Sequence, residues 1–357
     1  MTILRTDTVS GIGNTDGTVL EGNITFDSLN YMTLPKGTTN QRVNSAGGRA
    51  VIPGGYNPSV PAADRNLNSM VYIQIQTTGN ALDFGDLSFG SASGASCGSV
   101  TRGLTGASYV APAVQGSINN ISYYTIATTG NGADFGDLTQ GRSYINSFSS
   151  QTRGIWAGGV GSPTPSPYMS NVIDYVTIAT AGNATDFGDT ADLAYYGASG
   201  SSSPTRGMWA GGNPLEDMVQ YVTIASTGNA SDFGNLSADR AAPATAASST
   251  RTLIAGGNLV PDYSGINIID YVTTATTGNA KDFGDLAFSG SYIAGTSNSV
   301  RAVWSGLYGG SPSVTAQNVI QYSSIQTLGN TLDFGDLISA YSNLSGATSD
   351  THGGLTQ

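Results

Sequence analysis

Hydrophobic positions in this chain alternate with polar or small ones over short stretches, and turn residues separate the stretches. Residues 171–180 are the clearest case, with apolar side chains on both alternating faces, such as Val172 on one and Ile173 on the other. This period of two predicts a β-strand in a sheet that is covered on both sides. The pair Gly182-Asn183 follows, and we expect a tight hairpin there because both residues tolerate positive φ.

The same pattern returns six times along the chain. In every unit an Asp-Phe-Gly follows the long strand and its turn, and successive copies lie 46 to 52 residues apart. The copies begin at Asp83, Asp134, Asp186, Asp232, Asp282 and Asp333. A period near 50 residues in a glycine-rich chain of short strands is typical of a β-propeller. We therefore predict an all-β, six-bladed propeller over residues 49–350, with a seven-bladed ring that uses residues 18–48 as the alternative.

Each unit also contains a strand that begins with arginine and ends with a pair of small residues. The arginines are Arg49, Arg102, Arg153, Arg206, Arg251 and Arg301. Runs rich in serine and alanine, such as residues 197–203, are predicted to be the innermost strands because small side chains fit where strands converge on an axis. Residues 341–349 form such a run after the sixth unit, and we expect them to complete the first blade and remove its open edge. Residues 351–357 are a short C-terminal tail.

The repeated charged residues have a structural interpretation. We expect each repeat aspartate to accept backbone N–H bonds at its turn or to pair with a repeat arginine. We expect the six arginines to make contacts between blades. A repeated calcium site at pairs such as Asp186 and Asp189 is the alternative, although a hard cation needs six or more oxygen ligands.

Catalytic residues are scarce in this chain. His352 is the only histidine and Cys97 the only cysteine, which argues against histidine-based catalysis, a disulfide and a cysteine-ligated zinc site. Glu21 and Glu216 are the only glutamates, and neither has an evident carboxylate partner. We predict no enzymatic activity, no cofactor and no bound metal.

Charge and hydropathy restrict the possible partners further. The formal net charge is −11, with 13 basic residues among 357, which argues against a surface for nucleic acid. No stretch approaches the roughly 20 apolar residues of a membrane span, so membrane insertion is not expected. Residues 1–7 lack the apolar core of a secretory signal, so we expect the chain to mature in the cytoplasm of the cell that makes it.

The loops between the second and third strands of the units differ widely, whereas the Gly-Asn turns are nearly identical. Varied loops on a rigid scaffold indicate a binding face, and tyrosine and asparagine suit sugars through stacking and hydrogen bonds. The candidate ligand-face residues are Tyr56, Asn57, Tyr168, Asn213, Asp262, Tyr263 and Tyr308. The alternative is a set of unconstrained loops with no ligand.

Residues 1–48 lie outside the repeat and contain too few large apolar side chains to form a core of their own. We therefore expect this arm to associate with the propeller, with copies of itself or with another protein.

The repeating unit resembles the kelch-type repeat, with the phenylalanine of Asp-Phe-Gly where that family has an outer-strand tryptophan. The run Leu34-Pro35-Lys36-Gly37-Thr38-Thr39-Asn40-Gln41-Arg42 resembles the segment Leu-Pro-x-Gly-Thr-Thr-x-Gln-Arg of tail-fibre and other virion proteins of bacteriophages, notably marine ones. The repeat is also similar to propellers of such phages.

The resemblance implies a non-enzymatic virion protein of the tail fibre, tail or capsid surface. It implies that residues 1–48, including Leu34, Pro35, Lys36 and Gly37, attach a homo-oligomer to other virion proteins. The variable loops would then contact a host-surface glycan or protein, on a particle assembled in the host cytoplasm. A free kelch-type protein-interaction module is the alternative, and an envelope-polysaccharide depolymerase is a third candidate.

Overall fold

The computed structural model describes residues 48–355, apart from residues 62–63, 110–115, 162–168, 194–198, 214–215, 260–263 and 310–315. All described residues belong to the second of two units, into which the chain divides between Gln41 and Arg42. The attachment residues Leu34, Pro35, Lys36 and Gly37 lie outside the described residues.

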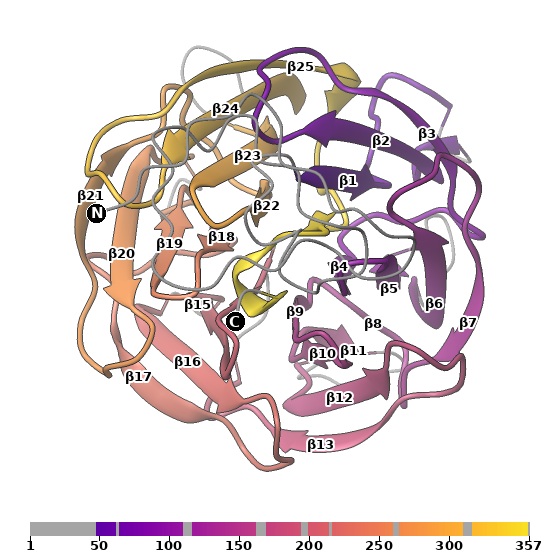
Figure 1. The fold of residues 1–357 in the computed structure, drawn as a ribbon, viewed down its shortest axis with the longest axis horizontal. Coiled ribbons are helices and arrows are strands. Elements are labelled where there is room, and N and C mark those ends of the chain that lie inside the picture. The colour runs from indigo at the N-terminus through magenta and orange to yellow at the C-terminus, as the bar shows by residue number, and fades with distance from the viewer. Residues whose placement is uncertain are drawn as a thin grey trace, which may run out of the picture. The chain divides into compact units, whose positions relative to one another are not determined.

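Six four-stranded antiparallel sheets follow one another around a common axis, each forming one blade (Figure 1). From the axis outward, blade 1 consists of β26 (Thr348–Ser349), β1 (Arg49–Pro53), β2 (Ser69–Gln74) and β3 (Leu82–Asp86), and blade 2 of β4 (Ala95–Gly98), β5 (Arg102–Tyr109), β6 (Ser117–Thr125) and β7 (Ala133–Asp137). Blade 3 consists of β9 (Asn146–Ser149), β10 (Arg153–Ala157), β12 (Val172–Thr177) and β13 (Thr185–Asp189), and blade 4 of β14 (Ser201–Ser202), β15 (Arg206–Ala210), β16 (Met218–Thr223) and β17 (Ser231–Asn235). Blade 5 consists of β18 (Ala244–Ala247), β19 (Arg251–Ala255), β20 (Ile268–Thr273) and β21 (Lys281–Asp285), and blade 6 of β22 (Ala294–Ser297), β23 (Arg301–Tyr308), β24 (Ala316–Ser324) and β25 (Leu332–Tyr341). A small sheet of β8 (Arg142–Ser143) and β11 (Val160–Gly161) and a 3₁₀ turn, η3 (Gly353–Leu355), complete the described elements.

The structure confirms the six-bladed propeller. Blade 6 contacts blade 1 directly, because Gly79 N–H donates to the carbonyl of Phe334 and the Arg301 guanidinium donates to the carbonyl of Ile75. No space therefore remains between the first and last units for a further blade, and the seven-bladed alternative is wrong.

The first blade takes its inner strand from the far end of the chain. Strand β26 pairs with β1 in the register Ala50 with Ser349 and Val51 with Thr348. This strand lies within residues 341–349, which the sequence predicts to complete the first blade. All four strands of blade 1 are thus paired, and β1 has no open edge toward the axis.

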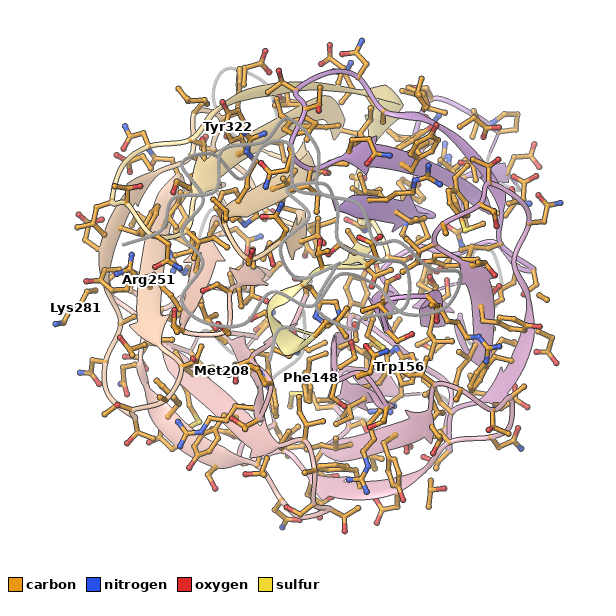
Figure 2. The ribbon with its side chains drawn as sticks, in the orientation of Figure 1. Phe148, Trp156, Met208, Arg251, Lys281 and Tyr322 are labelled. Carbon is orange, nitrogen blue, oxygen red and sulfur yellow. The ribbon has the colours of Figure 1, made fainter. Side chains whose placement is uncertain are left out.

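The inner strands are made of small residues because the axis is crowded. A Cβ on Gly295 would lie 2.2 Å from the carbonyl oxygen of Thr245 in the neighbouring blade, and one on Gly98 would lie 3.0 Å from the Thr348 hydroxyl. Larger side chains pack between blades, in six buried clusters that each join two neighbours. Phe148, Trp156 and Met208 belong to this inner packing, whereas Lys281 points outward at the periphery (Figure 2).

The six repeat arginines connect neighbouring blades, as the sequence predicts, but through backbone carbonyls and tyrosine rings. Arg102 lies over the ring of Tyr123 in its own blade, 4.7 Å from the centroid, and donates to the carbonyl of Ile178 in the next blade at 2.8 Å. Equivalent arginine–tyrosine and arginine–carbonyl contacts recur in all six blades. Each tyrosine also meets the buried phenylalanine of Asp-Phe-Gly edge to face.

The Gly-Asn turns fasten each blade to the preceding one. In blade 2, Gly130 N–H donates to the carbonyl of Phe84, and the Asn131 side-chain oxygen accepts from Asp86 N–H at 3.0 Å. The same two contacts occur at every blade junction, with the asparagine bond at 3.0–3.2 Å. The predicted tight hairpin is therefore wrong: the connection is longer, and the asparagine serves as an acceptor between blades.

This junction explains the glycine of Asp-Phe-Gly, and we expect Gly85→Ala to destabilise the protein by about 2–3 kcal/mol. Gly85 has a φ of +137°, and a Cβ there would lie 2.5 Å from the Gly130 carbonyl oxygen. Leu82→Ala is the matched control, because Leu82 is exposed on the same strand and the next unit has alanine at that position. Urea unfolding midpoints measure both, and equal midpoints would contradict the interpretation.

Candidate functional site

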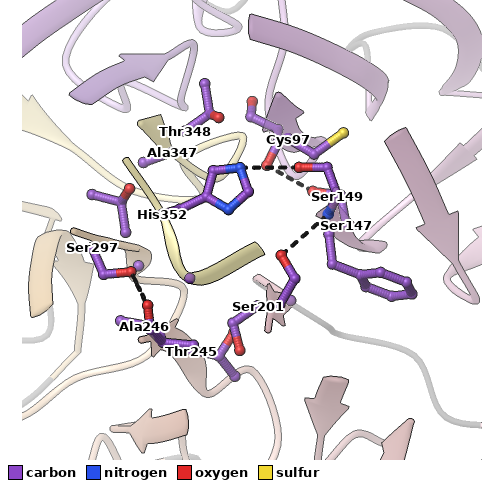
Figure 3. Close-up of a pocket in the computed structure, with 18 residues that line it drawn as sticks. Cys97, Ser147, Ser149, Ser201, Thr245, Ala246, Ser297, Ala347, Thr348 and His352 are labelled. Carbon is purple, nitrogen blue, oxygen red and sulfur yellow. Dashed lines mark hydrogen bonds between the residues drawn. The ribbon is translucent and has the colours of Figure 1, made fainter. Parts of the chain in front are cut away.

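The axial channel contains a cavity of about 30 Å³ at the end where the C-terminal segment enters (Figure 3). Hydroxyl groups from the inner strands line it, and the hydroxyls of Ser201 and Thr348 have no hydrogen-bond partner among the described residues. A polar cavity of this size accommodates about two water molecules. We therefore interpret it as a site for ordered water, since it is too small for an organic ligand.

His352 enters the same cavity and secures the C-terminal segment. Its Nε2 donates to the Gly98 carbonyl at 2.9 Å and lies 3.2 Å from the Ser149 hydroxyl, while Nδ1 accepts from Gly354 N–H at 3.2 Å. Burial lowers the pKa of His352 to about 4. The imidazole is thus neutral: its proton is on Nε2, and the lone pair of Nδ1 accepts the Gly354 N–H. It is therefore not arranged to remove a proton from Ser149.

This histidine makes the attachment of the C-terminal segment to the propeller sensitive to acid. Its folded pKa lies below the unfolded value of about 6.5, so the stability it provides is present above pH 6.5 and is lost as the pH falls toward 4. We expect a loss of up to about 3 kcal/mol over that range in the natural protein. In His352→Gln, which retains a donor and an acceptor, the corresponding loss should be smaller, as measured by urea unfolding from pH 7 to pH 4. Identical pH dependence in both proteins would contradict this assignment.

Cys97 also lies at the cavity but is not poised for reaction. It is 3% exposed, and burial raises the pKa of its thiol well above the ordinary value. Because the thiolate is the nucleophilic form, this cysteine is expected to remain inert in the folded protein.

The repeat aspartates lie exposed on the outer strands. Asp232 accepts the backbone N–H of Gly234 at 2.8 Å, within strand β17. Within the described part of the chain, however, no repeat arginine pairs with a repeat aspartate, and no three His, Cys, Asp or Glu side chains gather closely enough to hold a metal ion.

Two buried ion pairs fasten linkers to the blades that follow them, which the sequence interpretation missed. Arg142 pairs with Asp174, and Arg240 pairs with Asp270 at 2.8 Å, with all four side chains inaccessible to solvent. Each arginine lies eight residues after the first aspartate of an Asp-Phe-Gly, and each partner precedes the tyrosine of the next long strand. The joint occurrence of arginine and aspartate at these two repeat positions was the signal that could have revealed the pairs.

The antiparallel order of each blade sends the loops between second and third strands, and the linkers between blades, to one face. We call this the variable face; the Gly-Asn turns occupy the other. Of the predicted ligand-face residues, Tyr56, Asn57, Asn213 and Tyr308 are described, whereas Tyr168, Asp262 and Tyr263 lie outside the described residues.

Tyrosines from separate blades meet on the variable face. The ring centroids of Tyr144 and Tyr292 are 6.2 Å apart, and those of Tyr292 and Tyr308 are 6.5 Å apart. Burial raises the pKa of Tyr144, and the nearby phenols of Tyr109 and Tyr56 add to the shift. We call these five residues the tyrosine cluster. Two of the predicted residues, Tyr56 and Tyr308, therefore belong to one site.

The other two described residues have separate surroundings. The side-chain oxygen of Asn57 accepts from Ser59 N–H at 2.9 Å and shapes its own loop. Asn213 lies in blade 4, in the same loop as Glu216 and Asp217. Burial, together with the nearby carboxylates of Asp192 and Asp217, raises the pKa of Glu216 to about 7.

The linkers between blades form a collar at the axial end of the variable face. Ser93, Tyr144, Ala242, Tyr292 and Asn343 occupy equivalent repeat positions, and each has a φ between +49° and +56°. Backbone bonds connect them: Ser93 N–H donates to Asn343, Tyr144 N–H to Ser93, and Tyr292 N–H to Ala242. Non-glycine residues in this conformation cost on the order of 1–3 kcal/mol each, so the surrounding structure must hold them there.

Comparison with known proteins adds no assignment: no protein-family model matches the chain, and no curated protein is significantly similar to it. In the described ranges, no helix has the length and apolar character needed to cross a bilayer.

Proposed function

We propose that this chain is a non-enzymatic recognition protein whose variable face binds a glycan or protein on a host surface. The tyrosine cluster is the observation that carries the proposal. The opposite face repeats one junction six times, with the same backbone and asparagine contacts at each blade. Residues that differ between blades, and aromatic rings suited to contact a ligand, are on the variable face instead.

We further propose that the protein belongs to a bacteriophage particle, as a component of the tail fibre, tail or capsid surface. The resemblance of residues 34–42 and of the repeat to phage virion proteins supports this proposal. In it, residues 1–48 attach a homo-oligomer to other virion proteins, and the propeller is exposed on the particle after assembly in the host cytoplasm. The function requires no cofactor.

Binding of the full-length chain to an array of host-type glycans and to intact host cells tests the recognition role. Saturable binding is the expected result, and an absence of binding to every surface would overturn the proposal. Release of reducing sugar from envelope polysaccharide would instead favour a depolymerase.

Mass spectrometry of purified particles tests the virion assignment. We expect the full-length chain in the particles and expect a chain without residues 1–48 to be absent from them. Retention of the shortened chain would contradict the attachment role.

A free protein-interaction module is the second candidate, because a propeller with varied loops on one face is equally suited to bind another protein. Such a module would be missing from purified particles, so the same measurement separates the two candidates.

A further inference from the structure

The collar is not uniform, and its two tyrosines break the repeat symmetry. At the equivalent positions of other blades, the chain has Ser93, Ala242 and Asn343. Ser93 and Ala242 make the same kind of backbone connection as Tyr144 and Tyr292, with small side chains. Closure of the collar therefore does not require an aromatic ring.

Tyr144 and Tyr292 have an unusual backbone conformation for aromatic residues. Tyr144 has a φ of +54° and Tyr292 a φ of +55°, a region that bulky residues seldom adopt. Strained residues cluster at ligand sites, where the strain positions a side chain for a task. The aromatic side chains of Tyr144 and Tyr292, whose rings contact each other, therefore add to the collar something that the backbone connection does not need.

The cluster combines aromatic surface with hydroxyl groups. Tyr144 and Tyr292 meet at 62° between ring planes, and Tyr292 and Tyr308 at 68°, so the rings form an edge-to-face chain. Tyr308 is 39% exposed and so is Tyr109, which places aromatic surface within reach of solvent. Stacking on a tyrosine face, with phenol groups to donate and accept hydrogen bonds, suits the apolar face and the hydroxyls of a sugar ring.

An arginine at the cluster and the net charge of the whole chain together disfavour an ionic ligand of either sign. Arg65 donates to the Tyr56 phenol at 3.1 Å, and its guanidinium would repel a cation. The net charge of −11 opposes a polyanion. An uncharged ligand meets neither barrier.

We propose that the tyrosine cluster at the axial end of the variable face is the binding site for a neutral sugar ring. The inference rests on the proposed recognition function and specifies its ligand class and location. Tyr144 and Tyr292 provide the central contacts beside the axis, and Tyr308 extends the aromatic surface toward blade 6.

The repeat supplies the test variants. Tyr144→Ser and Tyr292→Ala each install the residue that another blade already has at that collar position, so the backbone connection is preserved. Leu332→Ser is the matched control, because Leu332 is an exposed outer-strand residue that has serine as its counterpart in blade 4. The probes are neutral glucan, galactan and mannan oligosaccharides, a sulfated and a uronic-acid oligosaccharide, and choline, each titrated into the full-length chain.

The expected result is binding of at least one neutral oligosaccharide, weakened about tenfold or more in each tyrosine variant and unchanged in Leu332→Ser. Preference for choline or for the charged oligosaccharides would overturn the ligand class. Binding of neutral sugar that survives both tyrosine substitutions would overturn the location while leaving the recognition function intact. If no saccharide binds but the chain still binds host cells, the sugar site is refuted and a protein ligand is favoured; if it binds neither, the proposed function itself fails.

Discussion

Ending the chain after Tyr341 should abolish the cooperative folding of the propeller. The removed residues include β26, which supplies the inner strand of blade 1. They also include Leu344 and Ala347, two members of the buried cluster between blades 6 and 1. We expect a loss of more than about 5 kcal/mol, which is comparable with the whole stability of many domains. Circular dichroism and thermal unfolding would show a broad transition or none.

The removed segment also connects to blade 2, so its loss affects more than one sheet. The Ser345 hydroxyl lies 2.7 Å from the Ser91 hydroxyl, and the Ser345 carbonyl accepts from Ser96 at 2.6 Å. A synthetic peptide of residues 342–357 should therefore restore a cooperative transition in a concentration-dependent manner. A chain that ends after Leu355 is the control and should unfold like the natural protein. An unchanged unfolding midpoint in the longer truncation would show that β26 is dispensable.

The sequence predicted those features that depend on spacing and side-chain size. A period near 50 residues gave the six blades, and the runs of serine and alanine indicated the inner strands. The segment after the sixth unit had no later unit to join, which pointed to blade 1. These inferences succeeded because crowding at an axis and the need to pair an open edge follow from local composition and repeat number.

Contacts between units were less accessible from the sequence. The Gly182-Asn183 pair predicts a tight hairpin, whereas the Asn183 side chain accepts from Asp137 N–H in the preceding blade. A residue that recurs in every unit is thereby marked as structurally important. Its recurrence does not reveal whether its hydrogen-bond partner lies in the same unit or in the neighbouring one. The collar was missed for another reason, since Tyr144 and Tyr292 lie about 150 residues apart and share a site only through the ring.

Replacement of Arg240 by methionine should destabilise the protein by about 3–5 kcal/mol, because it leaves the Asp270 carboxylate buried without its cation. The guanidinium donates to Asp270 at 2.8 Å and to the Ile254 carbonyl at 3.3 Å, and burial lowers its pKa despite the neighbouring carboxylate. Asp270→Leu should cost a similar amount, since it leaves the arginine charge in the same buried place. Urea unfolding at neutral pH measures both single variants.

The double variant Arg240→Met/Asp270→Leu separates the value of the pair from the cost of breaking it. Among the described residues, the linker from blade 5 is bound to blade 6 without an ion pair, through Gln321 and the backbone of Phe288, so such a junction does not require charges. We expect the double variant to be more stable than either single variant, because two apolar side chains remove both desolvation penalties together. If the two losses simply add, the pair contributes nothing beyond its separate side chains, and the ion pair would have no role as a unit in fastening the linker to blade 5.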